Sequence, residues 1–356
     1  MVPNGWLHKQ IGEIASIQVG RDLVEDKYSE ISTTEYKYPV YSNTVENKGL
    51  YGFYNFPEYS GNAITIVGRG VGLGKAFARS PGESFGAIGR LLVLTPKNNS
   101  FDVIFFANYI NFALRIHNES GGIPQLPGAS LSKYFVMLPP LAEQQKIAQI
   151  LSTWDKAIAV TEQLLANSQQ QKKALMQQLL TGKKRLLDEN GARFEGEWEE
   201  FSLGNIAKVY QPKTISQSQL SFDGYPVYGA NGIIGYYCDF NHELEQIAVT
   251  CRGSTCGVVN WTMPKSWITG NAMVINVDNN SAISKKFLFY VLSNADLKYL
   301  ITGSGQPQIT GDIKNHVVHL ASFKEQKVIA QVLTIADQEI EVLQRKLDCL
   351  QQEKKA

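Results

Sequence analysis

A glycine-rich string at residues 68–76 offers the most suggestive chemistry in the sequence, because such loops can wrap phosphates with backbone N–H groups. The string is Gly-Arg-Gly-Val-Gly-Leu-Gly-Lys-Ala. A nucleotide-binding P-loop needs Gly five residues before its Gly-Lys pair and Ser or Thr after it, but Arg69 and Ala76 occupy these places. The GxGxxG fingerprint fails as well, because Leu73 stands where a glycine is required. We therefore expect a flexible turn after a strand, carrying the two cations Arg69 and Lys75.

Exposed cations and N–H groups suit DNA phosphates, and Arg can pair with guanine while Asn and Gln pair with adenine. The Arg69-Gly70 pair recurs as Arg252-Gly253, which favours a DNA contact over a plain surface turn. The Asn candidates could equally be turn residues, and the Gln candidates could belong to a structural loop before the last strand. The predicted DNA-binding residues are Asn43, Lys48, Arg69, Gly70, Lys75, Gln125, Asn231, Arg252, Ser254, Thr255 and Gln308.

The chain is long enough, at 356 residues, for two or more domains. Its net charge of +1 neither indicates nor excludes nucleic-acid binding, since binding depends on a local patch. No apolar run approaches the roughly 20 residues of a membrane helix, and the first ten residues lack an apolar signal core. We therefore expect a cytoplasmic protein.

The sequence is written twice. Five blocks recur in the same order, with an offset that shrinks gradually through small deletions. They are Trp6 with residues 11–15 and Trp198 with 203–207, residues 39–41 and 226–228, Arg69-Gly70 and Arg252-Gly253, residues 124–126 and 307–309, and the Glu-Gln pairs at 143–144 and 325–326.

Each copy begins with a region rich in Gly, Tyr, Val and Ile, spanning residues 1–141 and 192–322. Short apolar runs at 63–67, 91–94 and 247–250 predict strands joined by Gly- and Asn-rich turns. Residues 102–116 and 285–300 predict helices. The predicted fold class is α+β, with two duplicated α/β domains.

Each copy ends in a predicted long helix, within residues 142–191 and 323–356. Apolar residues there recur at alternating steps of four and three, the repeat of a coiled coil. Pro139-Pro140 and Gly182 predict the limits of a helix over 142–181, and the second helix is expected to stop soon after Leu350. The alternative is an amphipathic helix lying on its own domain. The predicted interface residues are Ile147, Leu151, Trp154, Ile158, Leu165, Ile329, Leu333, Ile340, Leu343 and Leu347.

Two such helices paired antiparallel would separate the duplicated domains and relate them by a pseudo-twofold axis, a symmetry that duplex DNA shares. The junction Leu-Pro-Pro-Leu-Ala-Glu-Gln-Gln-Lys-Ile-Ala at 138–148 resembles the end of a target recognition domain running into a spacer helix. Residues 177–186 and 194–198 resemble the entry to a second such domain. The whole chain is thus similar to the specificity subunits of type I restriction–modification systems, although residues 321–324 depart from the junction pattern.

The resemblance implies a non-catalytic subunit that reads a bipartite double-stranded DNA target with an unspecific gap set by the helices. Two modification (methyltransferase) subunits and a restriction subunit are the implied partners. The chain itself would need no cofactor, and S-adenosylmethionine, ATP and Mg²⁺ would bind to the partner subunits. The alternatives left open are a coiled-coil scaffold that binds no DNA, and a specificity module of a type IIB or IIG restriction enzyme.

Catalytic and metal-binding patterns are missing from the sequence. The Pro-Pro pair lacks the flanking Asn or Asp and aromatic residue of amino-methyltransferases. His316 and His319 are predicted to point to opposite faces of a strand. Cys251 and Cys256 lack a second pair with zinc spacing, and reduced thiols are expected throughout. We therefore predict neither a catalytic nor a metal site.

Overall fold

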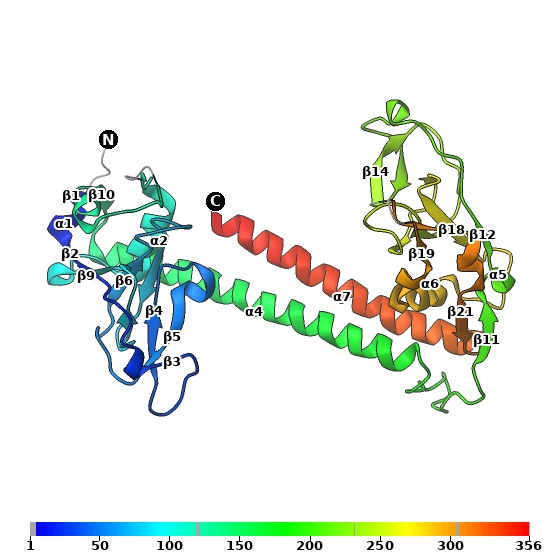
Figure 1. The fold of residues 1–356 in the computed structure, drawn as a ribbon, viewed down its shortest axis with the longest axis horizontal. Helices are drawn as coiled ribbons and strands as arrows, with labels where there is room; N and C mark the ends of the chain where they lie inside the picture. Colours follow the sequence, from blue (N-terminus) through cyan, green and yellow to red (C-terminus); the bar gives the residue numbers. More distant parts are fainter. Residues whose placement is uncertain (1–4, 119–121, 231, 304–305, 356) are drawn as a thin grey trace. The chain divides into compact units, whose positions relative to one another are not determined.

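The apolar runs of the sequence form short β-strands in a computed structural model, which describes residues 5–118, 122–230, 232–303 and 306–355 (Figure 1). The chain divides into two compact units. Unit 1 comprises Met1–Ala159 and Leu350–Ala356, and unit 2 comprises Val160–Cys349.

A four-stranded antiparallel sheet forms the centre of unit 1. Its strand order is β2 (Ala15–Val19), β9 (Leu92–Pro96), β6 (Ala63–Ile66) and β7 (Ala76–Arg79). Helix α2 (Val103–Ala113) packs against it, so that Ile64 and Leu94 share one core with Phe106. The Asp102 carboxylate accepts hydrogen bonds from two N–H groups in the first turn of α2, both at 2.9 Å. An N-cap thus fixes where the helix begins.

A second sheet of unit 1 has the order β3 (Tyr28–Ser29), β5 (Leu50–Tyr54), β4 (Tyr38–Tyr41) and β8 (Gly86–Ala87), with β4 and β8 parallel. The pairing of β4 with β5 shifts register between Val40 and Tyr41. The first and last strands, β1 (Leu7–Gln10) and β10 (Phe135–Leu138), pair with each other. Short helices α1 (Ile11–Ile14) and α3 (Gly128–Leu131) complete the domain. The chain therefore leaves the domain beside the strand by which it entered.

Unit 2 repeats this topology, except that its second sheet has three strands instead of four. Its four-stranded sheet has the order β12 (Lys208–Tyr210), β18 (Ala272–Asn276), β15 (Ile247–Thr250) and β16 (Val259–Trp261). Its second sheet joins β14 (Gly232–Tyr237), β13 (Tyr225–Gly229) and β17 (Trp267–Ile268), and β11 (Glu199–Ser202) pairs with β21 (Val317–Leu320). The register shift recurs between Val227 and Tyr228. Helices α5 (Leu203–Ile206) and α6 (Lys285–Asn294) match α1 and α2, so the α+β fold and its duplication are confirmed.

Unit 2 also differs from the sequence-based expectation. The helix predicted over 285–300 stops at Asn294, and a separate 3-10 turn covers Leu297–Leu300. The cause is Asp296, whose carboxylate accepts a hydrogen bond from the Lys298 N–H at 3.1 Å and starts the new turn. In unit 1, the helix predicted over 102–116 is shorter, because Asp102 is its cap and Leu114 is already extended.

The two long helices are α4 (Leu141–Leu179) and α7 (Phe323–Lys355). Helix α4 begins directly after Pro140, and the residues predicted to continue the spacer to 191 leave the helix after Leu179, near Gly182 with φ +68°. Helix α7 continues to Lys355, five residues past Leu350 and within the predicted limits of 323–356. Nothing in residues 351–355 breaks a helix, since they are Gln, Glu and Lys.

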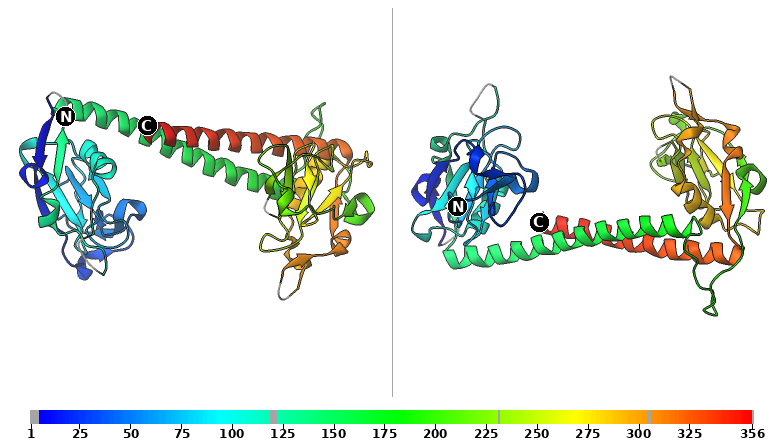
Figure 2. Two further views of the ribbon diagram at one scale, coloured as in Figure 1. Left: turned by 90° about the horizontal axis from the view of Figure 1, so that it is seen from above. Right: turned by 60° about the horizontal axis from the view of Figure 1, so that its bottom comes forward.

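Helices α4 and α7 pair within unit 2 (Figures 1 and 2). The Ser168 hydroxyl donates to Glu339 Oε1 at 3.2 Å, and Lys172 forms an ion pair with Asp337. The later α4 residue meets the earlier α7 residue, so the helices are antiparallel. Polar contacts at otherwise apolar seam positions oppose slippage of the register.

The predicted seam residues are all buried or half-buried. Leu165, Ile329, Leu333 and Leu347 are buried. The other predicted seam residues are half-buried: Ile147, Leu151, Trp154, Ile158, Ile340 and Leu343. Apolar residues off the seam are exposed, among them Val160 and Leu164 at 59% and 47%. Part of this burial comes from the globular domains, because Ile147 packs against the core of unit 1 and Ile329 and Leu333 belong to the core of unit 2.

The glutamine of each Glu-Gln pair joins a domain to its long helix. The Gln144 side chain accepts from the Asp102 N–H at 2.9 Å and donates to the Pro139 carbonyl at 2.9 Å. Gln326 repeats this with the Ser284 N–H at 2.9 Å and the Ala321 carbonyl at 2.8 Å. Both glutamines are buried, so each amide satisfies backbone groups that would otherwise lack partners.

Candidate nucleic-acid interface

The predicted Arg and Gln residues of each copy lie side by side. Arg69 forms an antiparallel β-bridge with Gln125, and Arg252 forms one with Gln308. Residues opposite each other in an antiparallel pair extend from the same face. Two segments far apart in the sequence therefore place an arginine beside a glutamine, and the two units do so in the same way.

Backbone hydrogen bonds hold this arrangement in place. In unit 1, the Gly70 N–H donates to the Pro124 carbonyl and the Leu126 N–H donates to the Gly68 carbonyl, both at 2.9 Å. In unit 2, the Gly253 N–H donates to the Pro307 carbonyl and the Ile309 N–H to the Cys251 carbonyl, both at 3.0 Å. The arginines thus stand on short, fixed pieces of backbone.

The glycine-rich string forms a tight hairpin that returns into β7. Gly70, Gly72 and Gly74 have φ values of +88°, +88° and +83°, which only glycine adopts readily. The Gly74 N–H donates to the Val67 carbonyl at 2.8 Å, so the string closes on itself. The string is therefore a closed turn, as expected from a sequence that lacks two of the residues required in a P-loop. A Cβ at Gly70 would meet nothing within 4 Å, and a ligand can approach the backbone there.

The cations at this site are open to solvent. Arg69, Lys75 and Arg252 are exposed, and none of them forms an ion pair within the described ranges. A pocket of about 150 Å³ is lined by Arg69, Gln125 and Arg90, among others. Guanidinium and amide donors converging on one hollow suit a ligand rich in acceptors.

Arg90 is a site residue that sequence reasoning missed. It lies between β8 and β9, and no recognisable sequence motif includes it. In the internal repeat, Gly89-Arg90 aligns with Gly270-Asn271, so that Asn271 is its counterpart. That alignment is the signal that could have found it, because polar residues at matched turns of both copies border the Arg–Gln bridges.

Asn43 has a structural role in unit 1. Its Oδ1 accepts from the Gly68 N–H at 2.8 Å, and its Nδ2 donates to the Gly89 carbonyl. The side chain ties together the turns that carry Arg69 and Arg90. This favours the turn interpretation over direct base contact. Its counterpart Asn231 lies outside the described residues.

The corresponding link in unit 2 uses hydroxyl groups. Thr250 and Thr255 both donate to the Ala230 carbonyl, at 2.8 and 2.9 Å. Thr255 is therefore committed to the protein backbone, whereas the neighbouring Ser254 is exposed. Gln308 is more exposed than Gln125, which is half-buried.

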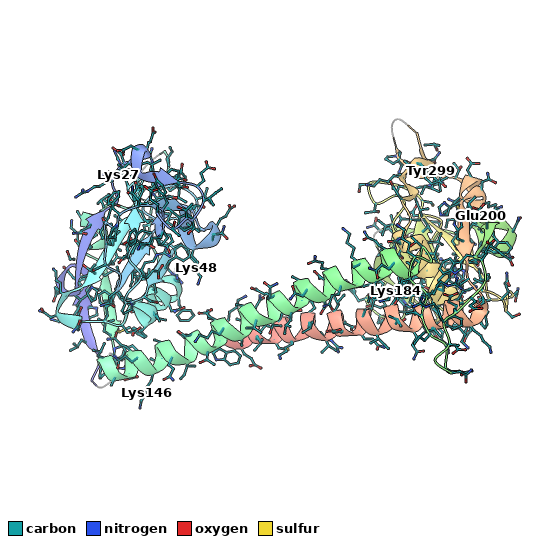
Figure 3. The ribbon with its side chains drawn as sticks, turned by 90° about the horizontal axis from the view of Figure 1, so that it is seen from below. Lys27, Lys48, Lys146, Lys184, Glu200 and Tyr299 are labelled. Carbon is teal, nitrogen blue, oxygen red and sulfur yellow. The ribbon has the colours of Figure 1, made fainter. Side chains whose placement is uncertain are left out.

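Lys48 lies on a loop that a buried arginine supports. Asn47 and Lys48 have φ values of +45° and +56°, and the Lys48 carbonyl accepts from the Arg79 guanidinium at 2.6 Å. Arg79 is 3% exposed, donates to Thr65 Oγ1 and stacks 3.3 Å from the Tyr41 ring centre. The Lys48 side chain is exposed, on the surface of unit 1 (Figure 3). A rigid backbone thus presents a solvated cation.

Metal-binding clusters are not found among the residues that the structure describes. The four cysteines are free thiols. His319 Nε2 lies 2.9 Å from Glu200 Oε1, whereas His316 Nδ1 lies 2.7 Å from the Tyr299 hydroxyl. Glu200 and Tyr299 are labelled in Figure 3. The two histidines therefore have separate partners. Within the same described ranges, no helix is long and apolar enough to cross a membrane.

Comparison with known proteins gives a consistent result across both copies. The family model for the type I restriction modification DNA specificity domain matches residues 3–167 and 195–352. A putative type I specificity subunit of Mycoplasma pneumoniae is 27% identical over 337 residues, covering 91% of this chain and 87% of that protein. The MjaVIII type I specificity subunit of Methanocaldococcus jannaschii is 21% identical over 402 residues, covering 99% and 91%.

Solved structures support the fold. The S subunit of a type I restriction–modification system from M. genitalium aligns with a TM-score of 0.74 at 18% identity, covering 98% of this chain and 94% of that one. The two family-model matches together span most of the sequence, one in each copy. The chain therefore belongs to the type I restriction–modification DNA specificity family.

Proposed function

We propose that this chain reads a bipartite double-stranded DNA target, one half-site with each unit. The observation that carries the proposal is the duplicated bridge that joins Arg69 to Gln125 and Arg252 to Gln308. Arg offers a bidentate match to guanine, and Gln offers one to adenine. Exposed Lys75 and Ser254 follow these arginines closely in sequence, and exposed Lys48 lies on the loop before β5; all three suit the phosphate backbone.

The chain itself performs neither methyl transfer nor cleavage in this proposal. Two modification subunits and a restriction subunit supply these reactions, with S-adenosylmethionine, ATP and Mg²⁺ bound to them. The long helices offer a surface for such partners, since Val160 and Leu164 lie one helical turn apart and are both exposed. The spacing between half-sites then depends on the helices and not on base contacts.

The direct test measures DNA binding by the full chain with its modification subunits. We expect Arg69→Ala and Arg252→Ala each to weaken binding by about 1–3 kcal/mol, with the loss confined to one half-site. Lys146→Ala is a matched control, because it removes an exposed cation from α4 and leaves both Arg–Gln bridges intact.

A coiled-coil scaffold predicts a different outcome. Such a protein would show no salt-dependent binding to DNA, and neither arginine substitution would change it. Methyl transfer by the purified chain alone would contradict the assignment of chemistry to partner subunits.

A further inference from the structure

The turn that carries Arg90 adopts a conformation that disfavours arginine. The Leu91 N–H donates to the Ile88 carbonyl at 3.2 Å and closes a four-residue turn. Both central residues are left-handed, with φ +64° at Gly89 and +66° at Arg90. This is the type I′ pattern, in which Asn and Gly predominate. A long side chain at such a position is sterically strained.

The surrounding structure holds the strained turn in place. The Gly89 N–H donates to the Arg21 carbonyl at 2.9 Å, and the Arg90 N–H donates to the Gly20 carbonyl at 3.3 Å. The Asn43 amide donates to the Gly89 carbonyl. Strain that several contacts impose on an exposed residue is typical of functional sites.

The matching turn of unit 2 has a different backbone conformation. There the Ala272 N–H donates to the Thr269 carbonyl at 3.0 Å, around Gly270 and Asn271. Neither of these two has a positive φ. Asn tolerates the left-handed region, yet Asn271 occupies a turn that does not adopt it. Arg90 occupies a left-handed position that an asparagine would fit better. The side chain of Arg90, and not its backbone, accounts for its presence.

The surroundings of Arg90 indicate what that side chain binds. It lines the 150 Å³ pocket together with Arg69 and Gln125. Arg90 is exposed, and it forms no ion pair in the ranges that the structure describes. Both arginines line this hollow, and each guanidinium can match the acceptor pair O6 and N7 of one guanine in the major groove.

We propose that Arg90 is a specificity-determining residue of unit 1, whose guanidinium reads a guanine in the half-site beside the contact made by Arg69. This inference rests on the proposed function and assigns recognition of one guanine in one half-site to a named residue. It also makes the two half-sites chemically different, because Asn271 replaces the arginine in unit 2.

The test uses Arg90→Gly in the full chain with its modification subunits. Glycine relieves the left-handed strain, so the melting temperature should stay equal or rise. Discrimination of guanine from the other bases should fall about 5- to 150-fold at one position of one half-site. Competition with duplexes carrying each single base-pair change measures this. Arg90→Asn, which also fits the turn, should retain folding and shift the preference at that position towards adenine.

Lys265→Gly is the matched control. Lys265 is another exposed cation with a positive φ of +50°, in the β16–β17 turn of unit 2, away from Arg252 along β15. Its ion pair with Glu243, at 3.9 Å, is exposed on both sides and contributes little to stability. It should show the same thermal behaviour as Arg90→Gly and unchanged discrimination at every position.

Three outcomes would overturn the inference. Unchanged discrimination in Arg90→Gly would remove Arg90 from base reading. A uniform loss on all sequences, with a smaller salt dependence, would assign it to a phosphate. A lowered melting temperature would show a structural role. If Arg69→Ala also has no effect, the proposed function fails; if Arg69→Ala acts and Arg90→Gly does not, only this inference fails.

Discussion

A buried ion pair fixes the segment after α4 to the start of α7, and its removal should cost substantial stability. Arg185 donates to both carboxylate oxygens of Glu325, at 2.7 and 2.8 Å. The Glu325 side chain is 0% exposed and that of Arg185 is 20% exposed. Arg185→Met therefore leaves a carboxylate in the interior without its cation.

The magnitude follows from this asymmetric exposure. Breaking a buried pair by removing one partner costs about 3–5 kcal/mol. Because Arg185 retains some contact with water, we expect the lower limit, about 3 kcal/mol. Glu325→Gln should cost less, about 1–2 kcal/mol, because the guanidinium that remains can be hydrated. The double variant should lose less than the sum of both, since its second change removes the isolated charge.

Urea unfolding followed by tryptophan fluorescence measures these free energies, because unit 2 contains Trp198, Trp261 and Trp267. Glu143→Gln is the matched control: it occupies the same position of the other copy, but its side chain is exposed. We expect it to change stability by less than about 0.5 kcal/mol. A cost below about 1 kcal/mol for Arg185→Met, or equal costs for Glu143→Gln and Glu325→Gln, would refute the reasoning.

Three further predictions concern pH, spacing and partners. Burial lowers the pKa of His242, whose ring contacts the Tyr210 hydroxyl and Asn241. Its stabilising contribution is therefore present above the unfolded pKa of about 6.5 and is lost as the pH falls below it. His242→Gln should make the unfolding free energy depend less on pH between pH 7 and 5, and an unchanged slope would contradict this. One heptad inserted into each long helix lengthens each by about 10 Å and keeps the seam in register. Methylome sequencing should then show the same half-sites with a wider gap. An unchanged gap in an active variant would disprove that the helices set the gap. The double variant Val160→Glu, Leu164→Glu should no longer co-purify with modification subunits, although circular dichroism should show that it remains folded. Intact complexes would show that the partners bind another surface of the chain.

The sequence predicts best where structure is local or periodic. The apolar run at residues 247–250 predicts a strand, which the structure shows as β15. The heptad ladder predicts two long helices, which the structure shows as α4 and α7, but spacing alone does not distinguish packing on another helix from packing on a domain. Helix ends were less accurate. The Asp296 cap interrupts a continuous apolar pattern, which periodicity alone does not detect.

The candidate site could be predicted in its residue types but not in its geometry. Arg69 and Gln125 were selected separately, and only the long-range pairing of their backbones brings them together. Arg90 has no motif and is distinguished by its φ value, which the sequence does not contain. Asn43 was plausible as a base reader, yet the tertiary fold engages its amide with Gly68 and Gly89.

The most direct test of bipartite reading is the methylated motif in the DNA of a host that expresses the chain with its modification subunits. Sequencing of the methylome should give two short half-sites separated by a gap of unspecified bases. Arg69→Ala should relax one half-site and Arg252→Ala the other. A single uninterrupted motif, or the same half-site affected by both substitutions, would contradict the account.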